Sequence, residues 1–235
     1  MTRHYLLIDD NEAFAENLAE ILRDTGASVD VAHDGLRALK LVKETRYDAL
    51  VTDMRMPGMS GAEVLHEIRR LDPGVPAVLL SAYSLNEQLR MARRDGLLAV
   101  LSKPQQIPRL LKILAAARRS GAVLLVEDDI ALADNLSEAL CERGLTAVTA
   151  SELKELASIE ATPFAALVDL RLPDANFGEA LQAVESRWPE TPAIVMTAFG
   201  NEAQAVGARE CVHKPFDTAT VLARLEALYR EPKPA

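Results

Sequence analysis

The chain has 235 residues, of which 49% are apolar and 26% are charged, a composition typical of a globular protein of one or two domains. This composition excludes a disordered chain and a collagen-like fibre, and two cysteines are too few for a disulfide scaffold. The formal net charge of −9 is uneven: residues 1–119 hold 17 basic and 16 acidic residues, whereas residues 120–235 hold 9 and 19. The acidic second half argues against direct nucleic-acid binding, because the phosphate backbone attracts a basic surface.

The N-terminal segment gives a first indication of location. Four apolar residues, 5–8, are stopped by Asp9 and Asp10, a pattern typical of a strand and not of a signal-peptide core. No apolar run approaches the roughly 20 residues that span a bilayer. Cys141 and Cys211 are expected to be reduced thiols. We therefore expect a cytoplasmic protein with no membrane partner.

The chain contains the same pattern twice, about 115 residues apart, which indicates a duplicated domain and not a solenoid repeat. The repeated segments are 6–11 with 124–129, 51–57 with 167–173, 77–83 with 193–199, and 103–104 with 214–215. We therefore predict one domain over residues 1–119 and a second over 120–235. The connection near Ser120-Gly121 is short, so the two domains should be held close together.

Each copy alternates short apolar runs with amphipathic stretches. In the first copy the apolar runs predict strands near residues 5–8, 28–31, 49–52, 77–80 and 99–101. Between the first two, Phe14, Leu18 and Leu22 fall on one helical face, and Gly26 follows as a C-terminal stop. Strands that alternate with helices predict an α/β domain whose parallel sheet is covered on both faces.

Polar residues follow the predicted strands where the strands end: Asp9, Asp10, Asp53, Ser81 and Lys103. The carboxyl ends of parallel strands converge on one crevice. Three carboxylates there would repel one another, and a hard cation such as Mg²⁺ resolves that conflict. A lysine and a hydroxyl beside the cation suit a phosphoryl group, and an aspartate that attacks phosphorus would become an aspartyl-phosphate.

Each of these residues also has a simpler interpretation. Asp10 or Asn11 could cap the first helix, Asp53 could belong to a turn, and Lys103 could be a solvated strand end. The recurrence of the whole set in the second copy favours the functional interpretation.

On these motifs both halves resemble the receiver domains of two-component response regulators. The first half carries Asp9-Asp10, residues 53–61, Ser81-Ala82 and Lys103-Pro104, and the second carries Glu127-Asp128, residues 169–173, Thr197-Ala198 and residues 214–216. The resemblance covers nearly the whole chain. It implies two tandem flavodoxin-like (βα)5 domains, each with a parallel five-stranded sheet of order 2-1-3-4-5.

The resemblance also implies a role for each motif residue. Asp53 and Asp169 are the implied phosphoacceptors, which take phosphate from a histidine kinase or a histidine phosphotransfer protein. One Mg²⁺ per domain is implied, held by Asp9, Asp10, Asp53 and the backbone carbonyl of Arg55 in the first half, and by Glu127, Asp128, Asp169 and the backbone carbonyl of Arg171 in the second. The implied phosphoryl-binding residues are Ser81, Lys103, Thr197 and Lys214. Because the acceptor is consumed as a substrate, we do not expect an enzyme and assign no catalytic residue.

Both copies depart from the family pattern. The family's inward-turning aromatic is replaced by Val100 and Cys211, and only 17 residues separate Thr197 from Lys214, against 22 in the first copy. The second domain should therefore have a shortened fourth helix. Tyr83 and Phe199 either line the site entrance or pack on the loop. Arg55 and Arg171 are expected to overhang the site and to slow dephosphorylation.

The expected function is that of a phosphorylated tandem receiver without an output domain, because only six residues follow Tyr229. It would act through contacts with a downstream protein or by phosphate relay. The alternative is a constitutive adaptor or dimerisation module in which phosphorylation is vestigial, above all in the second domain; a fragment of a larger regulator is a third interpretation. The basic residues of the fourth helix, Arg90, Arg93 and Arg94, predict an acidic partner, either the second domain or another copy. A homodimer through helix four, strand five and helix five of the first domain is one such arrangement.

Overall fold

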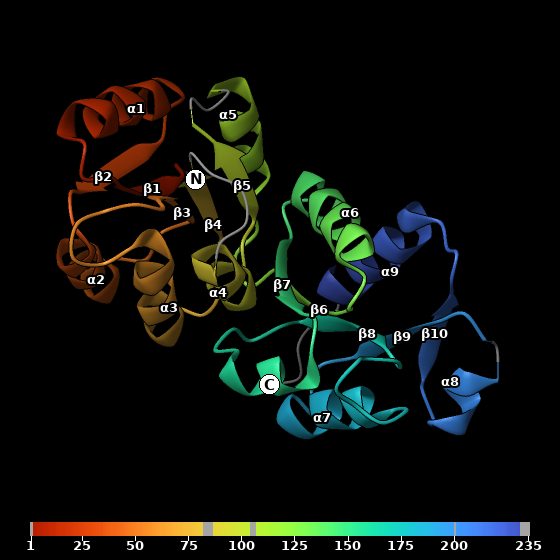
Figure 1. Ribbon diagram of the computed structural model, residues 1–235. Coiled ribbons are helices and arrows are strands. Elements are labelled where there is room, and N and C mark those ends of the chain that lie inside the picture. The colour runs from red at the N-terminus through yellow and green to blue at the C-terminus, as the bar shows by residue number, and fades with distance from the viewer. Residues whose placement is uncertain (1, 82–86, 104–106, 200, 231–235) are drawn as a thin grey trace.

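The computed structural model describes residues 2–81, 87–103, 107–199 and 201–230. Within them the chain forms two parallel five-stranded sheets, one in each half, with helices on both faces (Figure 1). We call the halves domain 1 (residues 1–119) and domain 2 (residues 120–235). The strand orders β2-β1-β3-β4-β5 and β7-β6-β8-β9-β10 are both 2-1-3-4-5 within their own domain. The fold class expected from the sequence is therefore confirmed.

Domain 1 contains five strands and five helices among its described residues. The strands are β1 (His4–Ile8), β2 (Ser28–Ala32), β3 (Ala49–Asp53), β4 (Ala77–Ser81) and β5 (Ala99–Ser102). The helices are α1 (Glu12–Asp24), α2 (Gly35–Glu44), α3 (Gly61–Leu71), α4 (Glu87–Asp95) and α5 (Ile107–Ala116). Every strand predicted from the apolar runs is present, and each is one residue longer than predicted.

Apolar side chains on the two faces of this sheet make two separate cores. Leu7, Val51 and Leu80 pack with α1 and α5 on one face, and Leu6, Leu50 and Leu79 pack with α2, α3 and α4 on the other. The alternation follows from the strand period of two residues, because both faces of a parallel sheet are buried.

The N-cap of α1 is Asn11, whose side chain accepts a hydrogen bond from the amide of Phe14. Asp10 is thus left available at the strand end.

Domain 2 has the same order of strands and helices, but its second and fourth helices are short. Its strands are β6 (Ala122–Val126), β7 (Thr146–Ala150), β8 (Ala165–Asp169), β9 (Ala193–Thr197) and β10 (Glu210–His213). Its helices are α6 (Ile130–Glu142), the 3₁₀ helix η1 (Leu153–Ser158), α7 (Glu179–Arg187), α8 (Glu202–Ala205) and α9 (Thr218–Arg230). The fourth helix, α8, has only four residues, as the short Thr197–Lys214 spacing predicts. Trp188 is the C-cap residue of α7 and packs against the core.

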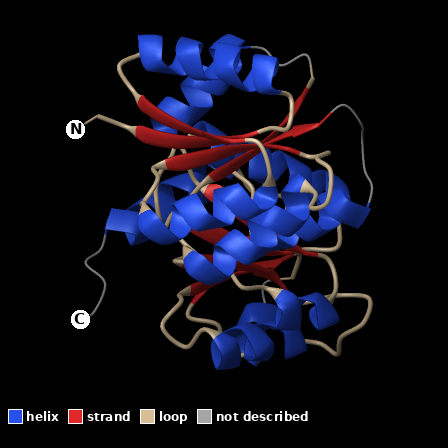
Figure 2. Cartoon of the chain, turned by 90° about the vertical axis from the view of Figure 1, so that its left-hand side faces the viewer, coloured by secondary structure: helices blue, strands red, loops and turns tan. Residues whose placement is uncertain are grey.

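The two domains pack directly against each other (Figure 2). Leu97, between α4 and β5, forms an antiparallel bridge with Ala147 of β7, with N···O distances of 3.0 and 3.2 Å. Cys141 of α6 packs against the α1–α5 core of domain 1. Ion pairs surround this contact, joining Arg93 to Asp134, Arg94 to Glu155, Arg109 to Glu138 and Arg118 to Glu226.

The basic helix α4 of domain 1 lies against domain 2. Acidic residues of α6 and η1 in domain 2 pair with Arg93 and Arg94, because opposite charges on the two surfaces attract at short range. Domain 2 is therefore an acidic partner of this helix. The homodimer considered through helix four, strand five and helix five receives no support, because domain 2 covers that surface.

Among the described residues, no helix combines the length and the apolar character needed to cross a membrane. The expectations for Tyr83, Pro104 and the C-terminal residues 231–235 concern positions outside the described residues.

Candidate functional site

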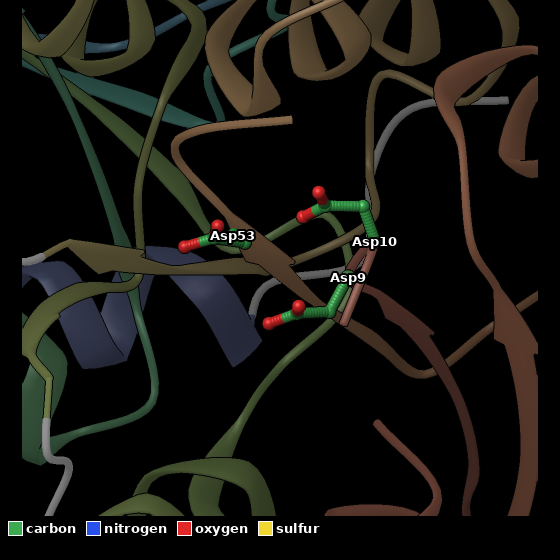
Figure 3. Close-up of side chains that lie close together, drawn as sticks. All are labelled: Asp9, Asp10 and Asp53. Carbon is green, nitrogen blue, oxygen red and sulfur yellow. The ribbon is translucent and has the colours of Figure 1, made fainter. Parts of the chain in front are cut away.

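Three acidic side chains meet at the carboxyl ends of β1 and β3 in domain 1 (Figure 3). Asp9 and Asp10 follow β1 directly, and Asp53 is the last residue of β3. Each offers a carboxylate oxygen, and these oxygens lie within 4.8 Å of one another. Asp9 and Asp53 are buried, whereas Asp10 is exposed. The predicted acidic group is therefore brought together, with one side open.

Lys103, which follows β5, brings a positive charge to the same site. Its Nζ lies 2.9 Å from Asp9 Oδ2 and 2.9 Å from Asp53 Oδ1. Burial alone would lower the pKa of Lys103, but the hydrogen bonds and negative charge of both aspartates outweigh burial and raise that pKa. Burial also raises the pKa of Asp53, and Lys103 offsets part of this rise. Lys103 thus stabilises the ionised form of Asp53.

Domain 2 reproduces this arrangement with a glutamate in the first position. Glu127 and Asp128 follow β6, Asp169 ends β8, and their carboxylate oxygens also lie within 4.8 Å of one another. Lys214 Nζ lies 2.6 Å from Glu127 Oε2 and also bonds to Asp169 Oδ2. Burial raises the pKa of Glu127, and Lys214 opposes that rise. The Lys214–Pro215 peptide bond is cis.

The two hydroxyl residues predicted to contact phosphate end the fourth strand of each sheet. Ser81 ends β4 and Thr197 ends β9, and both are buried. The Thr197 hydroxyl is 2.5 Å from Glu202 Oε2 on α8, and the amide of Phe199 donates to Thr197 Oγ1. Glu202 was not among the residues singled out from the sequence.

Arg171 lies at the rim of the second site, as its position two residues after Asp169 suggests. Its backbone amide donates to Asp169 Oδ1 over 2.8 Å. Its guanidinium bonds to Glu202 and lies 5.5 Å from the ring centroid of Phe199 and 5.9 Å from that of Phe177. Phe199 is 55% exposed, so it belongs to the rim and not to the core. In domain 1, hydrogen bonding from the backbone of Arg55 helps to lower the pKa of Asp53, against the larger effect of burial.

The acidic pair of domain 2 also faces domain 1. Glu127 and Asp128 line a cleft of about 540 Å³ whose opposite wall is α4, with Arg90, Arg93 and Arg94. One wall of the cleft is thus rich in positive charge and the other in negative charge. Access to the second acidic group from this side runs between the two domains.

The donor chemistry of both triads fits a magnesium ion. All the converging groups are carboxylates, the hard oxygen ligands that Mg²⁺ prefers, and one acid in each triad remains exposed enough to leave room for water. The role of the Arg55 and Arg171 carbonyls as further ligands stays a prediction.

Comparisons with known proteins agree with this geometry. The sequence profile of the response regulator receiver domain matches residues 5–115 and 123–226. The chain is 52% identical over 232 residues to a response regulator receiver protein of Anaeromyxobacter sp. (strain Fw109-5), a match that spans 97% of this chain and 96% of that protein. The transcriptional regulatory protein ZraR of Salmonella typhimurium is 36% identical over 123 residues, which make up 51% of this chain and 28% of ZraR.

A solved structure is similar to one half of the chain. The receiver domain of sensor histidine kinase PA1611 from Pseudomonas aeruginosa PAO1, crystallised with a magnesium ion in its active-site cleft, is 29% identical, with a TM-score of 0.45. The match covers 48% of this chain and 95% of that domain.

The fold and the paired acidic sites thus define a receiver of two-component signalling. The chain belongs to the response regulator receiver family and carries two receiver domains in tandem.

Two structurally important polar residues had no clear sequence signal. Glu202 lies on a helix of four residues, and Arg69 is a buried arginine in an otherwise amphipathic helix, α3. Nothing in their local pattern separates them from surface charges, because Asp95 and Gly96, which bond Arg69, and Arg171, which bonds Glu202, lie at least 26 residues away in the sequence. The spacing of Glu202 five residues after Thr197 was the only available clue.

Proposed function

We propose that this chain is a two-site phosphoacceptor, with Asp53 and Asp169 each taking a phosphoryl group from a histidine kinase or a histidine phosphotransfer protein in the presence of Mg²⁺. The observation that carries the proposal is the placement of a lysine ammonium against the buried acid and the acceptor in both domains. A purely structural ion pair needs only one acid per lysine. An acceptor site needs this surplus of carboxylates, which a cation and an incoming phosphoryl group then share.

The transfer step uses the ionised acceptor as nucleophile. A carboxylate oxygen of Asp53 attacks phosphorus, an O–P bond forms, and the bond from phosphorus to the donor breaks, with the electron pair leaving on the donor. Bound Mg²⁺ supplies positive charge that offsets the phosphoryl oxygens. Ser81 ends β4 and Lys103 follows the neighbouring β5, and in this proposal both residues bond those oxygens. Lys214 and Thr197 would take the same parts at Asp169.

We propose that the phosphorylated chain signals through contacts with a downstream protein or passes the phosphate on. The chain is then a substrate of phosphotransfer and not an enzyme.

Two observations favour a second candidate function for domain 2 alone. Its α8 has only four residues, and Thr197 is already bonded to Glu202. Domain 2 could therefore serve as a constitutive adaptor that packs against domain 1, with vestigial phosphorylation. This alternative makes a different prediction, since Asp169 would then take no phosphate under conditions that label Asp53.

Acetyl phosphate labelling of the full chain tests both candidates. With Mg²⁺ we expect two labelled sites in the unmodified chain, one in each of the Asp53→Asn and Asp169→Asn chains, and none in the double variant or after Mg²⁺ is chelated. Asp24→Asn, an exposed aspartate at the far end of α1, is the matched control and should keep both sites. Label that persists in the double variant would contradict the assignment, and label on Asp53 alone would support the adaptor.

A further inference from the structure

In domain 2 the Thr197 hydroxyl is hydrogen-bonded to Glu202, an acid that does not belong to the acidic triad. Thr197 Oγ1 donates to Glu202 Oε2 over 2.5 Å and accepts from the amide of Phe199 over 3.1 Å. Thr197 is 2% exposed, and the Glu202 side chain is 12% exposed. A hydroxyl has a single proton to donate. While that proton is directed to Glu202, it is not available to another oxygen.

The other carboxylate oxygen of Glu202 is occupied by Arg171. Both the Nε and the Nη2 of Arg171 donate to Glu202 Oε1, and the guanidinium is placed near the rings of Phe177 and Phe199. The backbone amide of Arg171 donates at the same time to Asp169 Oδ1. Glu202 thus connects Thr197 to Arg171, which lies two residues after Asp169 in the sequence.

The Glu202 carboxylate accepts hydrogen bonds from the Arg171 guanidinium and from the Thr197 hydroxyl, and none of these contacts requires a proton on Glu202. A negative charge at this rim would repel the negative oxygens of a phosphoryl group on Asp169. It would also compete with those oxygens for the Thr197 proton.

We propose that Glu202 is a positioning residue that holds Thr197 and Arg171 away from the phosphoryl position and thereby opposes the loading of Asp169. This inference rests on the proposed function of Asp169 as an acceptor. Loading requires Thr197 to exchange one acceptor, the Glu202 carboxylate, for another, a phosphoryl oxygen. The cost of that exchange falls on domain 2, because Glu202 bonds Thr197 and Arg171 of that domain.

The test compares labelling of Asp169 in full-length chains that carry Asp53→Asn, so that all label is on Asp169. With acetyl phosphate and Mg²⁺, we expect Glu202→Gln to raise the labelling rate constant about three- to ten-fold, the size expected when one charge-assisted hydrogen bond is exchanged at a partly exposed site. Glu202→Ala should raise it at least as much. Glu190→Gln is the matched control and should leave the labelling rate unchanged. Glu190 precedes β9, so it lies at the end of that strand opposite to Thr197.

A second series in the Asp169→Asn background measures Asp53 and should show no effect of Glu202→Gln. Equal or slower labelling of Asp169 after Glu202→Gln overturns the proposal, and so does an equal acceleration by Glu190→Gln.

A readout without phosphate separates this inference from the proposed function. If Asp169 takes no label in any chain, the acceptor assignment fails, and the role of Glu202 is then decided by the amide resonance of Phe199. That amide donates to Thr197 Oγ1, so its chemical shift should change on Glu202→Gln when the hydroxyl is released and should not change on Glu190→Gln. An unchanged Phe199 resonance shows that Glu202 does not position Thr197.

Discussion

The backbone amide of Arg118 in domain 1 donates a hydrogen bond of 2.9 Å to the carbonyl of Gly144 in domain 2. This contact places the loop after α6 against the end of α5. A Cβ atom at position 144 would lie 1.8 Å from the carbonyl oxygen of Ala116, which is backbone of the other domain. Gly144 also has a φ of +71°, a conformation that side chains disfavour. The close approach of the two domains therefore requires glycine here.

We predict that Gly144→Ala separates the two domains. The added methyl group meets rigid backbone, so the α6 loop must move away from Ala116 and Arg118. Gly207→Ala is a matched control, because Gly207 has a φ of +68° in the same domain and nothing within 4 Å of its Cβ position. Both variants bear the same backbone cost of roughly 1–2 kcal/mol. Amide exchange at Leu97 and Ala147, which form the bridge between domains, should become faster only in Gly144→Ala. Equal exchange in the two variants would contradict this prediction.

Arg69 is expected to be a major contributor to the stability of domain 1. It is 2% exposed, and its guanidinium donates to the backbone carbonyls of Asp95, Gly96, Val75 and Pro73. Burial lowers its pKa to about 10, so it is still charged at neutral pH. Arg69→Met should reduce the free energy of unfolding by roughly 3–5 kcal/mol, since it leaves several carbonyls without a donor.

The neighbouring Arg70 provides the control for this experiment. Its side chain is 60% exposed, so Arg70→Met should change the free energy of unfolding by less than about 0.5 kcal/mol. Urea denaturation of both variants measures the difference. A loss at Arg69 no larger than that at Arg70 would show that the buried hydrogen bonds contribute little net stability.

The acidic triads should bind two Mg²⁺ ions per chain. Asp10→Asn and Asp128→Asn each remove one exposed carboxylate and should each reduce the number of ions bound in titration calorimetry from two to one, because a neutral amide is a poor substitute for a charged ligand. Asp24→Asn should keep two. If Asp128→Asn retained both ions with unchanged affinity, the second triad would not be a metal site.

We predict that the charge of Glu226 contributes to the pH dependence of the free energy of unfolding at acidic pH. Hydrogen bonding from Arg143, together with the charges of Arg118 and Arg230, lowers the pKa of Glu226. A carboxyl group with a lowered native pKa stabilises the protein above its unfolded-state pKa of about 4.3, and this contribution is lost as the pH falls through the native value.

The Glu226→Gln variant tests whether this stabilisation is lost as the pH falls. At pH 7 it should lower the free energy of unfolding by less than about 1 kcal/mol, since these pairs are screened by solvent. The difference from the unmodified chain should disappear on acidification below pH ~4. A difference that stays constant across this range would show that the effect of the substitution does not arise from the Glu226 charge.

Much of the site geometry was predictable from the sequence because it depends on local order. Asp9, Asp53 and Lys103 directly follow or end apolar strands, and parallel strands bring such positions to one edge of the sheet. The duplication of the same pattern around Glu127 and Asp169 predicted the second site by the same reasoning. The short α8 followed from the number of residues between Thr197 and Lys214.

The packing between domains could not be derived in this way. The bridge from Leu97 to Ala147 and the approach of Gly144 to Ala116 join segments whose local patterns show no mutual preference. Many charged surfaces could pair with the arginines of α4, because exposed ion pairs are weak and nonspecific individually. Only the tertiary fit selects α6 and β7.

The sequence by itself determined two receiver domains, their strand order and the residues that line each acidic site, because strand periodicity and strand ends are local properties of the chain. The tertiary structure alone decided which surfaces of the two domains meet, and that Glu202 bonds to both Thr197 and Arg171. Those contacts depend on shape and charge complementarity between segments that are brought together only when the chain is folded.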